Sequence, residues 1–160
     1  MVALVIRAFF VEPIRVDGDS MLPTLIDGEH MVVEKLSYWT RGPARGEIII
    51  CFYPGYTESC VKRVIGLPGD AICVRNGRIY VNGEALDESS YWTGDIIGEM
   101  EPVTVGEKEV FVVGDNRNSS KDSRAPSVGC IPYNKIVGRV TAVIWPLSEF
   151  KKISKVDYTA

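Results

Sequence analysis

Glycine and proline interrupt this chain at short intervals, and that punctuation limits which elements it can form. The 160 residues include 15 glycines and 9 prolines. The apolar stretches between them are short, rich in valine and isoleucine, and lack the 3.6-residue period of a helix. Stretches of this kind are typical of strands, and we expect helix only near the chain ends. The sequence therefore predicts an all-β domain whose antiparallel sheets form an open barrel or pack face to face.

The clearest local signal is a hairpin at residues 71–75 and 78–81. Asn76-Gly77 lies between the two arms, and this pair favours a type I′ turn because both central residues need positive φ. The mostly polar segment 84–100 predicts a long surface excursion. Further apolar runs predict strands at 14–16, 29–35, 47–53, 60–67, 110–113 and 136–145.

Composition excludes several classes of function. The length favours one domain, and the formal net charge of -3 with no long basic run argues against nucleic acid as a partner. Four cysteines, with no Cys-x-x-Cys pair among them, argue against a structural zinc site. We therefore predict neither metal nor cofactor. We expect free, buried thiols, with a disulfide as the open alternative; the cysteines are Cys51, Cys60, Cys73 and Cys130.

The N-terminal segment 1–11 is apolar apart from Arg7. Glu12-Pro13 ends the run well short of the roughly 20 apolar residues that a membrane span requires. No small-residue cleavage site of a secretory signal follows it. Two interpretations stay open from composition: the trailing end of a span that begins before Met1, or the first element of the soluble fold.

Two distant segments carry complementary chemistry. Ser20 lies in the small-residue turn 18–24, and Lys62 lies in the otherwise apolar run 61–70. A serine hydroxyl needs a base to remove its proton, and a lysine serves as that base only where burial lowers its pKa. The single histidine, His30, lies beside a predicted strand without an Asp-Ser partner pattern, and we expect a structural role for it.

A third segment, residues 114–124, has no apolar side chain although it directly follows a predicted core strand. A loop so dense in donors and acceptors predicts either ordered, buried polar groups or a solvated loop with Asx turns. Its residues alone do not separate the two.

Together these segments resemble the type I signal peptidases, the membrane-associated serine endopeptidases that remove signal peptides from exported proteins. The likeness covers about residues 9–150, with several motifs in the same order and at similar spacing. The motifs are Ser-Met-x-Pro-Thr from Ser20, Arg45-Gly46-Glu47-Ile48-Ile49, the run Val61 to Asp70, the loop Gly114 to Arg124, and Gly138-Arg139 with Trp145-Pro146.

The resemblance implies a role for each of these sites. Ser20 would be the nucleophile, and Lys62, neutral at rest, would be the general base. The supporting residues that it implies are Ser120, which would hydrogen-bond and orient the lysine nitrogen; Asp122 and Arg124, which would form an ion pair; and Asp115 and Asn116, which would shape the site from below.

Two residues beside the nucleophile concern the substrate cleft. Some relatives carry a serine two residues before the nucleophile, whose hydroxyl helps to hold the oxyanion. Here that residue is Gly18, so the Ser20 backbone N–H and a second donor or water would have to do so. The resemblance implies that Met21 lines the apolar face of the cleft; simple core packing is its alternative.

The resemblance also implies an organisation and a place. Segment 1–11 would be the remnant of an N-terminal anchor, and residues 12–150 a catalytic domain with a small subdomain at about 78–109, followed by a tail at 151–160. The domain would lie on the extracytoplasmic side of the cell membrane. Its partners would be membrane lipid and the signal peptides of preproteins, cut after small residues.

Two alternatives remain. The self-cleaving repressors also use a Ser-Lys pair on a β fold, but they need a helix-turn-helix module, which this sequence lacks. A non-catalytic peptide-binding β module would retain the same fold, and the presence of Ser20, Lys62 and Ser120 together argues against it.

Overall fold

Strands dominate the computed structural model, which describes residues 11–158. The expected all-β class is confirmed: helix is confined to α2 (Ser37–Thr40) and two single 3₁₀ turns within the described residues. The strands are β1 (Val11–Arg15), β2 (His30–Glu34), β3 (Ile48–Phe52), β4 (Ser59–Gly66), β5 (Ala71–Arg75), β6 (Arg78–Val81), β7 (Glu84–Ala85), β8 (Met100–Thr104), β9 (Glu109–Val113), β10 (Ile131–Pro132), β11 (Ile136–Trp145) and β12 (Lys151–Lys152).

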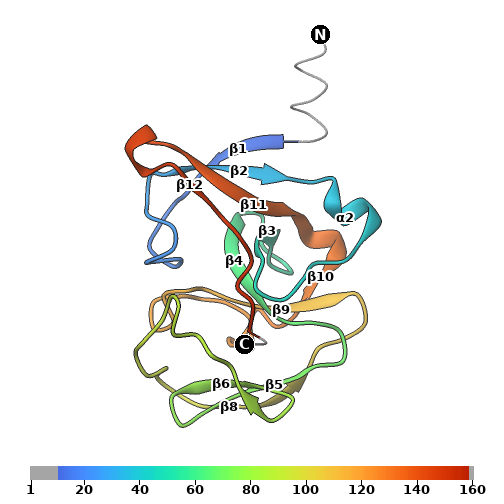
Figure 1. The fold of residues 1–160 in the computed structure, drawn as a ribbon. Coiled ribbons are helices and arrows are strands. Elements are labelled where there is room, and N and C mark those ends of the chain that lie inside the picture. The colour runs from blue at the N-terminus through green and yellow to red at the C-terminus, as the bar shows by residue number, and fades with distance from the viewer. Residues whose placement is uncertain (1–10, 159–160) are drawn as a thin grey trace.

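The larger sheet is antiparallel and open. Its strands follow the order β1-β2-β11-β3-β4-β9-β10, and β12 pairs with β11 beside this path. Figure 1 shows it curving around the upper part of the molecule, with β1 at one edge. Since neighbours such as β2 and β11 lie far apart in the sequence, the register between them depends on long-range contacts.

The smaller sheet packs below the larger one, in the order β7-β6-β5-β8. Its central hairpin has the expected turn, with Asn76 at φ 49 and Gly77 at φ 73. The expected boundary of the subdomain, 78–109, is corrected here, because β5 pairs with both β6 and β8. The small sheet therefore spans residues 71–104.

The segment 84–100 does not only run over the surface, as its polarity predicted. Glu88, Tyr91 and Ile96 are buried, and Ile96 belongs to the core below the larger sheet. The Tyr91 ring lies between two guanidinium groups, with centroid distances of 4.4 Å to Arg63 and 5.4 Å to Arg117. The polar composition of this segment predicted exposure, but Glu88 and Tyr91 can be buried because their polar groups have partners.

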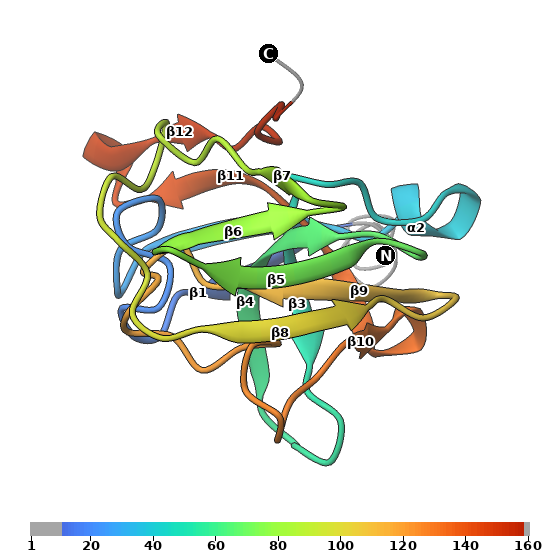
Figure 2. The same ribbon diagram turned by 90° about the horizontal axis from the view of Figure 1, so that it is seen from below.

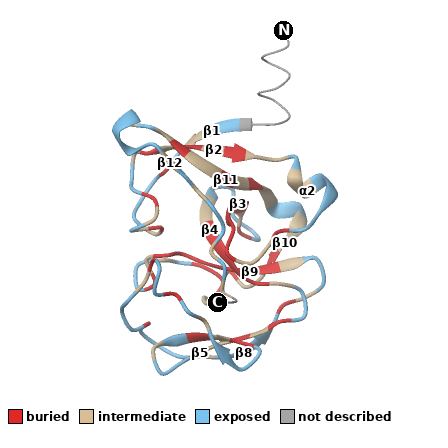
Figure 3. Cartoon of the chain, in the orientation of Figure 1, coloured by how far each residue is buried: buried red, intermediate tan, exposed pale blue. Residues whose placement is uncertain are grey.

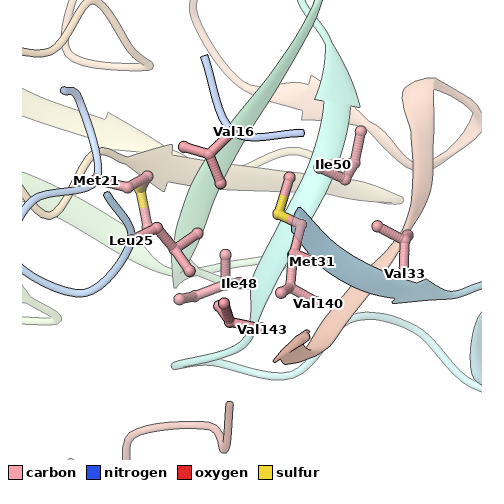
Figure 4. Packing of buried hydrophobic residues seen from close by; sticks show 9 residues of the cluster. All are labelled: Val16, Met21, Leu25, Met31, Val33, Ile48, Ile50, Val140 and Val143. Carbon is pink, nitrogen blue, oxygen red and sulfur yellow. The ribbon is translucent and has the colours of Figure 1, made fainter. Parts of the chain in front are cut away.

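Side chains alternate across the central strands and fill two layers. Ile65, Phe111 and Val113 face the small sheet, whereas Val64 and Val112 pack on the opposite side. This alternation is the period-two pattern of strands covered on both faces, and Figure 3 shows the resulting band of buried residues along β4 and β9. A third cluster, drawn in Figure 4, joins the turn around Ser20 to β2, β3 and β11.

The C-terminal segment is part of the fold rather than a separate tail. β12 pairs with β11, and the Val156 N–H donates to the Gly46 carbonyl at 3.2 Å. In Figure 1 the segment descends from the larger sheet towards the small one. The segment 1–11 was expected to be an anchor remnant. Its residues 1–10 lie outside the residues that the structure describes. No helix within 11–158 is long and apolar enough to cross a membrane.

Candidate active site

Ser20 lies in a turn that links β1 to β2. The Leu22 N–H donates to the Asp19 carbonyl at 3.1 Å, and the Gly18 N–H donates to Asp27 Oδ1 at 2.9 Å. Gly18 has φ +84, and a Cβ there would meet no atom within 4 Å. The position is therefore open in space, but its backbone conformation favours glycine.

Lys62 projects from β4 to the serine. Its Nζ lies 2.8 Å from Ser20 Oγ and also donates to the Val61 carbonyl at 2.8 Å. The lysine is 4% exposed, and this burial lowers its pKa below the ordinary value because the charged form loses its hydration. The two residues that the sequence singled out are in hydrogen-bond contact, across 42 residues of chain.

A cavity of about 510 Å³ opens beside the pair. Gly18, Ser20, Met21 and Lys62 are among its lining residues, together with the end of β1 and residues 58–61. Met21 is only 1% exposed and packs in the core cluster of Figure 4. Core packing of Met21 is therefore confirmed, and the residue also lines the cavity. Its contact with a substrate stays a prediction.

The polar loop 114–124 is ordered by buried groups, as the first of its two interpretations held. Asp122 accepts hydrogen bonds from Arg124 Nε and Nη2, both at 2.8 Å, which confirms the expected ion pair. The same carboxylate accepts from the Gly114 N–H at 3.0 Å. A side chain at Gly114 would collide with Ser120 Oγ and the Ser20 carbonyl. Glycine at this position therefore permits the close approach of the loop to the turn around Ser20.

Ser120 departs from its expected role. Its hydroxyl is buried but has no hydrogen-bond partner among the described residues, so the bond to the lysine nitrogen is not formed. Lys62 instead uses the Ser20 hydroxyl and its neighbouring carbonyl. Ser120 is still close to the pair, since it packs against the Gly114 backbone as Ser20 does.

Asp115 and Asn116 both contact the turn around Ser20. The Asn116 N–H donates to the Ser20 carbonyl at 3.0 Å. Asp115 is fully buried and accepts from Arg63 Nε at 2.7 Å and Thr24 Oγ1 at 2.5 Å. No role was expected for Arg63 or Thr24, although Arg63 directly follows Lys62 and Thr24 lies four residues after Ser20, inside the same motifs.

A second buried network also escaped the sequence analysis. Arg117 pairs with Glu88 at 2.5 Å and donates to the Tyr91 hydroxyl at 2.8 Å, and that hydroxyl lies 2.6 Å from the one of Tyr158. Burial is the largest influence on the pKa of Glu88 and raises it. No local pattern predicts such a set, because its members come from three distant segments.

Two further findings bear on the chemistry. His30 lies in β2 and is not among the residues that line the cavity of Ser20 and Lys62, although its cross-strand partner Arg15 is. Within residues 11–158, no group of three or more His, Cys, Asp or Glu side chains is placed to hold a metal ion.

Comparison with known proteins decides the family. The signal peptidase family, peptidase S26, matches residues 1–145. The chain belongs to this family. A protein of Synechocystis named "Probable signal peptidase I-2" is 39% identical over 154 residues, which are 92% of this chain and 69% of that protein. Signal peptidase IB of Staphylococcus aureus is 36% identical over 168 residues, covering 94% of this chain and 86% of its own.

A solved signal peptidase structure agrees with the fold. The crystal structure of a signal peptidase I from Enterococcus faecalis has a TM-score of 0.53 and 30% sequence identity, and it covers 63% of this chain and 98% of its own. Both the family and the open antiparallel architecture expected from the sequence are therefore confirmed. The chain is a serine peptidase of the signal peptidase I type.

Proposed function

We propose that this chain cleaves N-terminal signal peptides from exported preproteins, with Ser20 as nucleophile and Lys62 as general base. One observation carries the assignment of the pair: a buried lysine nitrogen lies 2.8 Å from the serine hydroxyl. Because burial lowers the lysine pKa, the neutral amine, whose lone pair can accept a proton, forms at lower pH than in an exposed lysine. No other serine is hydrogen-bonded to a lysine nitrogen among the side-chain contacts of residues 11–158.

The contact allows a two-step mechanism. Lys62 takes the hydroxyl proton while Ser20 Oγ attacks the scissile carbonyl carbon, and the Ser20 backbone N–H stabilises the oxyanion. The lysine then gives its proton to the departing amine, leaving an acyl-enzyme. In the second step neutral Lys62 takes a proton from water, which hydrolyses the ester and restores the serine.

The surroundings of the cavity suit an extended peptide. β1 is an edge strand, and its end lines the cavity at Ile14 and Arg15. A substrate strand that paired along such an edge would gain backbone hydrogen bonds, while side chains would fill adjoining pockets. Val16 and Ile50 add apolar walls, which supports a preference for small, uncharged residues before the cut.

The proposed place of action is the extracytoplasmic face of the cell membrane, with lipid as a partner. The apolar composition of segment 1–11 supports it, as does the large exposed fraction of Trp39, 65%. Aromatic side chains of this kind favour the headgroup layer of a bilayer.

A preprotein cleavage assay in lipid or detergent tests the proposal. Ser20→Ala and Lys62→Ala should each lower kcat/KM by about 10³-fold or more, because loss of either member of a cooperating pair disables both. His30→Ala is the control and should cleave like the parent. An active Lys62→Ala variant would refute the assignment, and cleavage of the chain itself in place of a preprotein would favour the self-cleaving alternative.

A further inference from the structure

Two cysteine thiols face each other beside the cavity of Ser20 and Lys62, and one of them, Cys60, lines it. Cys51 of β3 and Cys60 of β4 are directly opposite in the antiparallel register. Their Sγ atoms are 3.7 Å apart, and the Cys60 thiol also donates to the Cys51 carbonyl at 3.4 Å. Neither is in a disulfide in this structure.

The backbone is already spaced for a bridge. Residues directly opposite in antiparallel strands have Cα atoms about 4.5 or 5.5 Å apart, depending on the type of pair. Native disulfides join Cα atoms about 4.4–6.8 Å apart, so both values are within range. Side-chain rotation is therefore enough to bring the two sulfur atoms from contact to bonding distance.

The two thiols differ in access. Cys51 is fully buried, whereas Cys60 is partly exposed and lines the same cavity as Ser20 and Lys62. Cys60 and Lys62 are two residues apart on β4, so their side chains project from the same face of the strand. A small reagent that enters the cavity reaches Cys60 first and cannot reach Cys51 directly.

They also differ in acidity. The hydrogen bond from Cys51 is the largest influence on Cys60 and, with help from the nearby Lys62 charge, lowers the Cys60 pKa to about 7 against the effect of burial. The pKa of Cys51 is raised by its hydrogen bond to Cys60 and by burial. Cys60 therefore has the thiolate character of an attacking group. Cys51 is suited to the resolving step by its contact with Cys60 rather than by its acidity.

We propose that Cys51 and Cys60 form a redox-active dithiol, which a low-molecular-weight disulfide oxidises to an intrachain bridge beside the catalytic pair. The Cys60 thiolate attacks one sulfur of the reagent, which forms a mixed disulfide and expels one thiol. Cys51 then loses its proton to solvent and attacks Cys60 Sγ, which expels the second thiol. The protein loses two hydrogens, and the reagent is reduced to two thiols.

Oxidation changes the charge that Lys62 experiences, a consequence that rests on the proposed function. The groups that can carry negative charge near its nitrogen are Cys51, Cys60, Asp115 and Asp122. A Cys60 thiolate stabilises the lysine ammonium, whereas a disulfide carries no charge. The bridge therefore lowers the pKa of Lys62 further, and the neutral base forms at lower pH.

A thiol count on the whole chain tests the bridge without any need for peptidase activity. The Cys73→Ser/Cys130→Ser protein retains only Cys51 and Cys60. After incubation with oxidised glutathione, acid quench and unfolding, both thiols should be lost to maleimide labelling. Peptide mass spectrometry should find one intrachain crosslink and no retained glutathione.

The matched control adds Cys51→Ser to the same protein, and there glutathione should remain on Cys60. Two labelled thiols, a persistent mixed disulfide in the protein with both cysteines, or a crosslink between two chains would each overturn the dithiol.

The activity arm compares the pH dependence of preprotein cleavage before and after oxidation. The acid limb of kcat/KM should move to lower pH in the bridged protein and return on treatment with dithiothreitol. A Cys60→Ser variant of the same protein has no thiol that lines the cavity, and its acid limb should not respond to the same cycle. A bridged protein with an unmoved acid limb would overturn the link to Lys62. If no preprotein is cleaved at all, the proposed function fails while the thiol count still decides the dithiol.

Discussion

In the proposed mechanism, the environment of Lys62 sets the pH range of the reaction. An exposed lysine has a pKa of about 10.4 and is almost fully charged near neutrality. Burial lowers the pKa of Lys62, and the active form is the neutral one, so kcat/KM should rise with pH through the lowered value and level off below about pH 10. A pH–rate profile of preprotein cleavage measures this limb. A rate that still climbs beyond that point would mean that Lys62 is solvated during turnover.

At Gly18, the surrounding space would admit a side chain, but the backbone conformation disfavours one. A serine there has room, but φ +84 penalises any side chain. Gly18→Ser and Gly18→Ala should therefore both lose about 1 kcal/mol of unfolding free energy. Both variants carry the same backbone strain, so the ratio of their kcat values measures the effect of the serine hydroxyl alone. If this hydroxyl reaches the oxyanion, the serine variant should be a few-fold faster than the alanine variant. Urea unfolding and preprotein turnover, measured on both variants, provide the two readouts; equal turnover would show that position 18 does not face the oxyanion.

One buried ion pair, Arg63 with Asp115, joins β4 to the loop 114–124, and the same carboxylate accepts a hydrogen bond from Thr24 in the turn around Ser20. Asp115→Ala would leave the Arg63 guanidinium buried without its carboxylate and would remove the acceptor of Thr24. We expect a loss of about 3–5 kcal/mol in chemical unfolding, with lower kcat as the turn loses its anchor.

The control for this prediction is the exposed pair of Lys35 and Glu12, whose N···O distance is 2.7 Å. Glu12→Gln should cost less than about 1 kcal/mol, because solvent screens the charges. Equal losses for Asp115→Ala and Glu12→Gln would contradict the structural role of the buried pair.

At the scale of the whole molecule, the C-terminal segment connects the two sheets. The Val156 N–H donates a hydrogen bond to the Gly46 carbonyl, and the Tyr158 hydroxyl is hydrogen-bonded to the Tyr91 hydroxyl near the small sheet. Removal of residues from 156 onward should lower the unfolding free energy by about 2–3 kcal/mol, the sum of two hydrogen bonds and the burial of Tyr158. Tyr158→Phe removes one hydroxyl and should cost about 1 kcal/mol. Urea titrations compare the truncated chain and the Tyr158→Phe variant with the parent. An unchanged midpoint for the truncated chain would show that the segment does not contribute to stability.

Local residue patterns were enough to predict most of the strands and the two residues of the Ser20–Lys62 contact. Short β-branched runs between glycines and prolines specify strands locally, and the Asn76-Gly77 hairpin needs only its own residues. A nucleophile and an apolar-flanked lysine are likewise recognisable as residue types in their immediate surroundings.

Tertiary structure decided the rest, because it depends on register and burial between distant segments. The pairing of β3 with β4 places Cys51 opposite Cys60 and directs Lys62 into the cavity. The path of the loop 114–124 leaves Ser120 without the expected bond, and the packing of segment 84–100 buries residues whose polarity predicted exposure. Such buried polar contacts depend on exclusion of water and on partners from other parts of the chain, and a local sequence pattern predicts neither.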